Sequence, residues 1–288
     1  MAWTFSTSLD EFRDQAGAFL AARPAENTVL LTIAHRLARS GLTVFGEPPV
    51  FGWWRAGDGA AVAGAFLRTP PFVPRLSAMP PVAAAGLATA LAAAGSAFTT
   101  VTGVGGGAEA VRAFAAAWTA ATGAEQSVRR DERLYRLGEL TAPPRPPAGR
   151  HRLAEPADRD LAVRWYGEFL AEAGVELPDV PRAVDERTAV GGLHLWEDGE
   201  GRPVALAGSS PILAGMARIG PVYTPAASRG RGYGTAVTAA ASAHLLARGA
   251  TEVLLYTDLA NPTSNSIYQQ IGYLPVEDSL IMDFHRPR

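Results

Sequence analysis

A proline-rich segment near the middle of the chain constrains the fold more than any other feature of the sequence. Thr141–Gly149 carries four prolines in nine residues. Proline fixes φ and has no amide to donate, so this segment favours an extended, semi-rigid spacer over a helix or a central strand. It divides the 288 residues into halves of ordinary domain size. We expect one domain at 1–140, a linker at 141–149 and a second domain at 150–288.

Composition excludes several classes of function. The net charge of −2 gives no electrostatic footprint for nucleic acid or an anionic membrane. The absence of cysteine excludes disulfides, thiolate metal sites and cysteine nucleophiles. All 26 basic residues are arginine, so no lysine is available for a Schiff base. The first twenty residues have no apolar signal core, and no stretch is long and apolar enough for a membrane helix. We therefore expect a cytoplasmic protein.

Hydrophobic periodicity and turn residues outline the second half. Strands are expected at His151–Leu153, Leu193–Trp196, Pro203–Ala207, Ala217–Thr224, Glu252–Thr257 and Ser279–Phe284. Helices are expected at Ala157–Ala173, at Thr235–Ala247 and from Asn261 or Thr263 to near Gly272, while Pro181–Val190 fits a helix or a loop. The helix at 235–247 follows a glycine-rich loop and ends at Gly249, a favourable residue for a helix C-terminus.

The first half repeats this plan weakly, which suggests a duplicated module on element order alone. Helices are expected at Leu9–Ala22, Glu26–Arg39, Val82–Ala94 and Ala108–Ala121, and strands at Phe51–Arg55, Ala61–Leu67, Phe98–Thr102 and Val128–Leu137. Trp53 and Trp54 are adjacent, so in a strand they face opposite sides. We expect one of them in the core and the other at an interface or an acceptor pocket.

The sharpest local signal is the loop Arg229-Gly-Arg-Gly-Tyr-Gly-Thr235 between a strand and a helix. Amides at a helix N-terminus converge on an anion, and glycine allows the backbone to approach it closely. The loop is not a P-loop, which needs a lysine, and its G-x-G-x-G spacing matches a dinucleotide fingerprint poorly. Alone, it also fits a structural turn that packs the helix against the strand.

A second motif downstream makes the first one specific. Arg229-x-x-Gly232-x-Gly234 resembles the pyrophosphate-binding motif of the GNAT acetyltransferase superfamily. Asn261-x-x-Ser264-x-x-Ile267-Tyr268-x-x-x-Gly272-Tyr273 resembles the downstream motif of that superfamily, in the right order and at the right separation. The resemblance covers 150–288 and is strongest over 217–284. It implies an α/β fold with a mixed, mostly antiparallel sheet flanked by helices, here in two tandem GNAT-like modules.

The resemblance also implies acetyl-CoA as co-substrate, no metal, and a role for each matching position. The strand would bulge and splay at Gly220–Tyr223, so that Val222, Tyr223 and Thr224 contact the pantetheine arm and an amide near Val222 holds the thioester carbonyl. The pyrophosphate would be bound by Arg229, Gly230, Arg231, Gly232, Tyr233, Gly234 and Thr235. Asn261 and Ser264 would contact the arm or the phosphates, and Tyr268 would lie beside the sulfur. A phenol can protonate a leaving thiolate, so Tyr268 is the expected general acid.

The general base is not evident, because many members of the superfamily place a glutamate near the strand before the glycine loop, and 213–224 holds no carboxylate. Candidates are His194 and Glu197 on the hairpin, Glu168 and Glu172 on the preceding helix, and Tyr223. The five histidines lie far apart in the sequence without metal-ligand spacing, so no metal site is expected.

The corresponding loop of the first half, Leu76–Gly86, has no arginine and no paired glycines, and Pro80 and Pro81 remove two amide donors. We expect a non-catalytic domain there. The leading hypothesis for the chain is an N-acetyltransferase acting on an amine of a small molecule, peptide or protein, as a monomer or homodimer. The alternatives are an acyl-CoA-binding or sensory protein with little turnover and, less well supported, an interaction scaffold.

Overall fold

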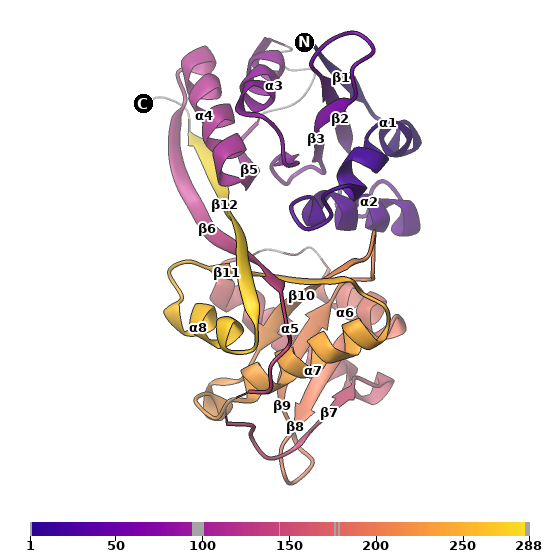
Figure 1. Cartoon of the computed structure of the whole chain (residues 1–288), viewed down its shortest axis with the longest axis vertical. Helices are drawn as coiled ribbons and strands as arrows, with labels where there is room; N and C mark the ends of the chain where they lie inside the picture. Colours follow the sequence, from indigo (N-terminus) through magenta and orange to yellow (C-terminus); the bar gives the residue numbers. More distant parts are fainter. Residues whose placement is uncertain (1, 94–100, 144, 176, 178, 286–288) are drawn as a thin grey trace. The chain divides into compact units, whose positions relative to one another are not determined.

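The computed structural model of the chain describes residues 2–93, 101–143, 145–175, 177 and 179–285. Its backbone forms two compact units, each a sheet flanked by helices (Figure 1). Unit 1 comprises Met1–Leu134, Asp258–Ala260 and Val276–Arg288, and unit 2 comprises Tyr135–Thr257 and Asn261–Pro275. None of the helices in these described ranges has the length and apolar character that a membrane crossing requires.

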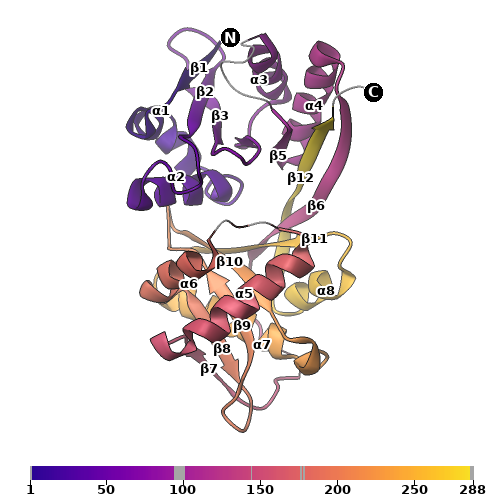
Figure 2. The same cartoon turned by 180° about the vertical axis from the view of Figure 1, so that it is seen from behind.

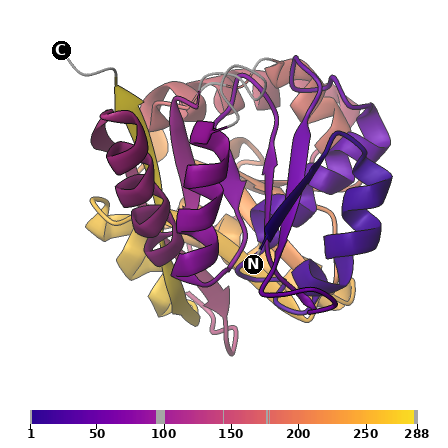
Figure 3. The same ribbon diagram turned by 90° about the horizontal axis from the view of Figure 1, so that it is seen from above.

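Unit 1 is built on strands in the order β1-β2-β3-β4-β5-β12-β6. The strands are β1 (Ala2–Ser6), β2 (Val50–Arg55), β3 (Val62–Arg68), β4 (Arg75–Leu76), β5 (Gly103–Gly107), β6 (Glu125–Leu137) and β12 (Tyr273–His285). The helices are α1 (Leu9–Ala21), α2 (Thr28–Ser40), α3 (Pro81–Ala93) and α4 (Ala108–Thr122). Strands β4 and β5 pair in parallel, whereas β1 to β4 pair antiparallel. Figure 3 shows α3 and α4 side by side, and both helices contribute to one apolar core.

Unit 2 is built on strands in the order β6-β11-β10-β9-β8-β7. The strands added here are β7 (Arg150–Leu153), β8 (Leu193–Glu197), β9 (Pro203–Ser209), β10 (Met216–Tyr223) and β11 (Glu252–Asp258). The helices are α5 (Arg159–Ala173), α6 (Val180–Ala189), α7 (Tyr233–Ala247) and α8 (Pro262–Gln270), with short 3₁₀ turns at Pro156–Asp158 and Ala226–Ser228. Thus Pro181–Val190, open from the sequence, is helical over most of its length.

The sheet of unit 2 is covered on both faces, and its strands show which residues face which helices. Helix α7 lies over one face (Figure 1), and α5 lies over the other (Figure 2). Side chains alternate along a strand, so Ala205 and Ala207 of β9 pack in the α7 core while Leu206 between them packs in the α5 core. Small residues on β9 and α7 allow the helix to lie close to the sheet, where the site described below begins.

Strands β6 and β12 each pass from one unit to the other. Residues up to Leu134 of β6 belong to unit 1 and Tyr135–Leu137 to unit 2, while β12 runs the opposite way and leaves unit 2 after Pro275. In unit 1, β12 pairs antiparallel with β5, and Arg133 of β6 bonds Asp278 of β12 at 2.6 Å. Each sheet is therefore completed by a strand from the other half of the sequence, and the units do not follow chain order as the expected domains 1–140 and 150–288 do.

The proline-rich segment is fastened within unit 2. The amide of Thr141 donates to the carbonyl of Ile271 (3.2 Å), and its hydroxyl donates to the carbonyl of Gln270 (2.9 Å). At its other end the indole N–H of Trp196 donates to the carbonyl of Ala148 (3.3 Å). Because both ends of the segment are hydrogen-bonded to residues of unit 2, the segment is part of that unit.

Three local expectations for the first half were wrong. The strand expected at Phe98–Thr102 falls partly on residues that lie outside the described ranges, and Val101 and Thr102 are not in a strand; the strand here is the glycine run β5. Glycine is needed in β5 because a Cβ at Gly103 would collide with the carbonyl of Met282. Both Trp53 and Trp54 are buried (4% and 5% exposed), so neither lines a surface. The short strands β1 and β4 were missed.

Candidate active site in unit 2

Strand β10 separates from its parallel neighbour partway along its length. Met216–Ile219 of β10 pairs with Glu252–Leu255 of β11, and within the described residues this pairing stops at Ile219 although both strands continue. On the other side, the register with β9 shifts between Ile219 and Val222. The bulge and the splay expected at Gly220–Tyr223 are thus present in the backbone. Within the described residues, β10 and β11 therefore do not pair with each other beyond Ile219.

The glycine loop leads directly into helix α7. Gly230 (φ +75°) and Gly232 (φ +81°) adopt left-handed conformations that favour glycine, and Gly232 is the N-cap of the helix. The first hydrogen bond of the helix runs from the amide of Ala236 to the carbonyl of Gly232, at 3.0 Å. Among the described residues, the six amides from Gly230 to Thr235 make no hydrogen bond within the protein. These amides point to an anion-binding role, since open donors and the helix dipole act together.

The proline-rich segment passes this loop. A Cβ at Gly232 would lie 3.6 Å from the carbonyl oxygen of Arg145 and 3.7 Å from Pro147, both within unit 2. A Cβ at Gly234 would lie 3.3 Å from the hydroxyl of Thr224. The backbone and side chains of neighbouring residues therefore lie close to the loop. Replacing Gly232 or Gly234 by any other residue would reduce the space around the amides of the loop.

Arg229 is held by protein groups. Its guanidinium donates two hydrogen bonds to the Glu172 carboxylate (2.7 Å each) and one to the carbonyl of Thr224 (2.9 Å), and it lies over the ring of Tyr223. The hydrogen bond to Glu172 raises the pKa of Arg229. The positive charge expected to meet phosphate at this position is thus already paired. In the part of the chain that the structure describes, Arg231 is exposed and has no such pair.

Helix α8 places Tyr268 against the same core. The ring of Tyr268 is partly buried and packs edge-on against Tyr273, with 6.1 Å between ring centroids. Burial raises the pKa of Tyr268 to about 12. Asn261 is exposed at the start of α8, where its carbonyl accepts from Asn265, and the side chain of Ser264 lies outside the description. A site role for Asn261 and Ser264 stays a prediction.

Tyr135 holds α8 in place and was missed by the sequence reasoning. Its buried hydroxyl donates to Oδ1 of Asn265 (3.0 Å) and accepts from Nε2 of Gln269 (3.1 Å), the residues on either side of Tyr268 along the helix. Tyr135 comes from β6, in the half of the sequence expected to be separate. No sequence signal linked it to α8, because the connection arises only from the passage of β6 into unit 2.

The base candidates have different surroundings. Glu197 is ion-paired with Arg150 and Arg152, and hydrogen bonds from these arginines lower its pKa, so it holds β7 to β8. Glu168 on α5 is exposed and hydrogen-bonded to Tyr223 at the end of β10. Burial and this hydrogen bond raise the pKa of Tyr223. Glu168 and Tyr223 therefore form a polar pair beside the splayed strand, whereas Glu197 does not reach it.

Three histidines that are far apart in the sequence lie together in unit 2. His151 and His194 are hydrogen-bonded at 3.0 Å, His194 contacts the Ser209 hydroxyl at 3.3 Å, and the ring of His244 lies 5.2 Å from that of His194. Burial, followed by the charges of His151 and His244, lowers the pKa of His194 to about 3. Within the described ranges no group of His, Asp or Glu side chains is arranged to hold a metal. The cluster is neutral at pH 7 and packs α7 against β7 and β8.

Comparison with known proteins relates this chain to one family and to several solved structures. Residues 159–273 match the model of the acetyltransferase (GNAT) family, and no curated protein matches the chain in sequence. The GCN5-related N-acetyltransferase from Sphaerobacter thermophilus has a TM-score of 0.63 at 19% identity, over 99% of this chain and 96% of that one. A GNAT-family acetyltransferase from Colwellia psychrerythraea gives 0.62 at 12% identity over 100% of both chains. A tandem GNAT protein from the clavulanic acid biosynthesis pathway gives 0.58 at 15% over 98% of both.

At these identities the structural likeness shows the fold. It confirms the expected fold class, mixed sheets flanked by helices in two GNAT-like modules. The match to the family model contains the splayed strand, the glycine loop and Tyr268, and it begins at Arg159, within unit 2. Residues 159–273, less than half of the chain, accordingly match a GNAT acetyltransferase domain.

Proposed function

We propose that unit 2 is an N-acetyltransferase that moves an acetyl group from acetyl-CoA to an amine. The observation that carries the proposal is the row of six amides at the N-terminus of α7, Gly230 to Thr235, which have no hydrogen-bond partner among the residues that the structure describes. Such a row matches the doubly charged pyrophosphate of coenzyme A, whose thioester supplies the activated acetyl group. The exposed Arg231 adds a guanidinium, and the Glu172 pair makes Arg229 a brace for the loop.

The splayed strand is the proposed seat of the thioester. Val222 and Tyr223 still pair with β9 but lie beyond Ile219, where the pairing of β10 with β11 stops, so the main-chain groups directed away from β9 face the pantetheine arm in this proposal. Attack by an amine develops negative charge on the carbonyl oxygen, and a fixed amide donor stabilises that charge. We assign this donor to the amide of Val222, with Thr224 bordering the loop that follows.

Tyr268 is the proposed partner of the leaving sulfur. With its pKa near 12, full proton transfer to a thiolate of pKa near 8.5 would be uphill by about 5 kcal/mol. The hydroxyl therefore acts as a hydrogen-bond donor that stabilises negative charge on the leaving sulfur, and the thiolate takes its proton from solvent after release. Tyr135 positions this hydroxyl through Asn265 and Gln269.

Glu168 is the base that we propose. An amine of pKa near 10 is mostly protonated at pH 7, so a carboxylate must accept a proton before attack. Glu168 is exposed to entering amines and is hydrogen-bonded to Tyr223, next to Val222. The raised pKa of Tyr223 keeps its hydroxyl protonated, so that it orients Glu168 by donating to it.

A second function, coenzyme binding with little turnover, is favoured by one observation. Strand β10 carries no carboxylate, and Glu172 is engaged with Arg229. If Glu168 does not act as a base, unit 2 still binds coenzyme A but has no group to accept the proton from the amine. The two functions share the binding step and differ only in turnover.

One set of assays on the full chain separates these outcomes. Thiol release from acetyl-CoA is followed with a panel of polyamines, aminoglycosides, amino-acid esters and peptides, and coenzyme A binding is measured by calorimetry. We expect amine-dependent thiol release that falls at least tenfold in Glu168→Gln and is unchanged in Asp160→Asn, an exposed carboxylate on the same helix. Binding without release for every amine favours the second function, and the absence of coenzyme A binding overturns both.

A further inference from the structure

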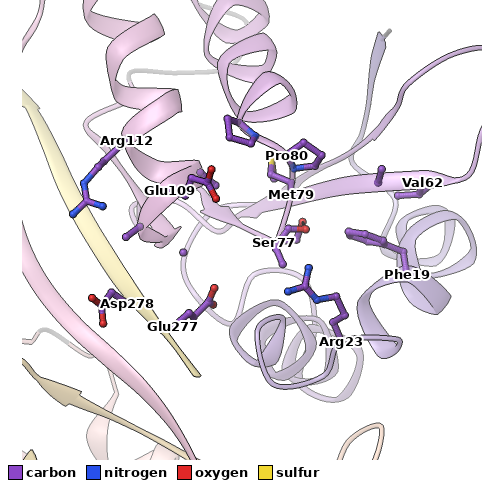
Figure 4. A pocket seen from close by; sticks show the side chains of 16 residues that line it. Phe19, Arg23, Val62, Ser77, Met79, Pro80, Glu109, Arg112, Glu277 and Asp278 are labelled. Atoms are coloured by element: carbon purple, nitrogen blue, oxygen red, sulfur yellow. Dashed lines mark hydrogen bonds between the residues drawn. The ribbon is translucent and has the colours of Figure 1, made fainter. Parts of the chain in front are cut away.

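A pocket of about 630 Å³ opens in unit 1, a volume typical of small-molecule sites (Figure 4). It lies where the loop before α3 meets the end of α1, the start of α4 and strand β12. All of its lining residues belong to unit 1. One side is apolar and is formed by Phe19, Val62, Met79 and Pro80, whereas Glu109, Glu277 and Asp278 lie on the other side.

Several polar groups at this pocket are already satisfied. Arg23 is ion-paired with Glu26 at 2.8 Å, and Asp278 with Arg133 at 2.6 Å. The hydroxyl of Ser77 accepts from the amide of Ala65 (2.9 Å) and donates to the carbonyl of Ala78 (3.2 Å). These groups shape the wall and leave little hydrogen-bonding capacity for a ligand.

Glu277 and Glu109 are the acidic groups that remain. Among the described residues neither carboxylate has a hydrogen bond or ion pair; Glu277 is partly buried and Glu109 is exposed. Its Oε2 lies 3.0 Å from where a Cβ of Gly107 would be, so the glycine makes room for this carboxylate. Burial and the negative charges of Glu26 and Asp278 raise the pKa of Glu277 to about 7, despite the opposing effect of Arg23. A positive group inside the pocket would stabilise the ionised form of this carboxylate.

The arginines near the pocket do not remove its preference for a cation over an anion. Arg112 is exposed and acts on Asp278, whose pKa it helps to lower after the larger effect of Arg133. The start of α4 favours an anion in principle, but Glu277 already brings a carboxylate beside Gly107, the N-cap of that helix. A cation therefore meets two carboxylates without partners, while an anion meets their repulsion.

We propose that this pocket of unit 1 binds a small organic cation, a protonated primary amine that carries an apolar group. The ammonium group lies between Glu277 and Glu109, and the apolar group packs on Phe19, Val62 and Met79. The site is separate from the coenzyme seat proposed in unit 2, and its ligand is held by charge and apolar contact without a covalent step. It gives the non-matching half of the chain a binding role of its own.

The test compares probes of one shape and three charges on the full chain at pH 8. Phenethylamine, 2-phenylethanol and phenylacetate are titrated by calorimetry and by ligand-observed NMR. We expect phenethylamine to bind at least tenfold more tightly than the alcohol, with no detectable binding of phenylacetate. Glu277→Gln should weaken amine binding about tenfold, while Glu125→Gln, an exposed glutamate of unit 1, leaves it unchanged.

A pH series on the unaltered chain tests the same site without a variant. Amine affinity should fall severalfold from pH 8 to pH 5.5, because Glu277 gains a proton over this range in the field of Arg23, Glu26, Asp278, Glu109 and Arg112. Equal binding of amine and alcohol, tighter binding of phenylacetate, or an affinity that does not change with pH overturns the proposal. Coenzyme A binding, measured in the same samples, reports on unit 2 independently.

Discussion

The starts of α3 and α7 occupy corresponding places in the two units, and they offer opposite surroundings to a ligand. Each helix follows the strand that pairs in parallel with its neighbour, β4 with β5 and β10 with β11. Around the start of α7, the six amides of Gly230 to Thr235 make no hydrogen bond within the described residues. Before α3, the amide of Ala78 is bound by Asn27, Pro80 and Pro81 have none, and the amides of Ala83 and Ala84 turn back to Pro80. Within the described residues, the same fold thus has amides without internal partners at the start of one helix and two carboxylates without partners beside a pocket in the other unit.

The largest effect is expected at Tyr268, because the reaction itself is assigned to unit 2. Tyr268→Phe removes the donor to sulfur and should lower kcat by about 100-fold or more. Coenzyme A affinity should change by less than about threefold, since phenylalanine keeps the packing against Tyr273. Steady-state kinetics and calorimetry measure the two quantities, and an unchanged kcat would remove Tyr268 from the mechanism.

Acid should weaken unit 2 through its histidine cluster. The pKa of His194 is lowered to about 3 from an ordinary 6.5, so the unfolded chain binds the proton first. Stability is complete above pH 6.5 and is lost as the pH falls towards 3, by about 3 kcal/mol at pH 4. His194→Gln should make the stability of unit 2 depend less on pH, which hydrogen exchange of β8 and β9 measures. His285→Gln, at an exposed position, serves as the control; an equal slope in both variants contradicts the account.

A matched pair of variants separates the effect of the glycine loop on ligand binding from the effect of backbone strain on stability. Gly232→Ala and Gly249→Ala both place a side chain at a left-handed φ, +81° and +92°, at opposite ends of α7. The two should cost similar stability, about 1 kcal/mol. Only Gly232→Ala should weaken coenzyme A binding, by about tenfold, because it shifts the open amides. Equal affinities in calorimetry would locate the anion seat elsewhere.

Base should weaken unit 1, opposite to the response of unit 2. The pKa of Glu277 is raised to about 7 from an ordinary 4.5, so the folded chain binds the proton more tightly. Its contribution is present below pH 4.5 and is lost as the pH rises through 7, about 1 kcal/mol after allowance for solvent. Relative to the unaltered chain, Glu277→Gln should gain stability at pH 8 and not at pH 4. Hydrogen exchange in β5 measures this, and a pH-independent difference argues against a raised pKa.

Local signals predicted most elements of unit 2 and the place of its glycine loop. The loop, the apolar run after it and the short helix at Tyr268 are recognisable because their residues lie close together in the sequence. The contacts made by Tyr135, the three-histidine cluster and the pairing of Arg229 with Glu172 were not predictable, because each joins elements remote in sequence. The strand β5 was misplaced because its glycines have low strand propensity and are required by close neighbours instead.

The passage of β6 and β12 between the units has a consequence for the separability of the halves. A fragment that starts at Arg150 would lack Tyr135 and the end of β6, so β11 would present a bare edge able to pair with other chains. A fragment that stops before the proline-rich segment would lack β12, and β5 would be bare in the same way. Neither half of the sequence therefore contains all the strands of the unit that it mainly forms, so we expect neither half to fold correctly when it is expressed alone.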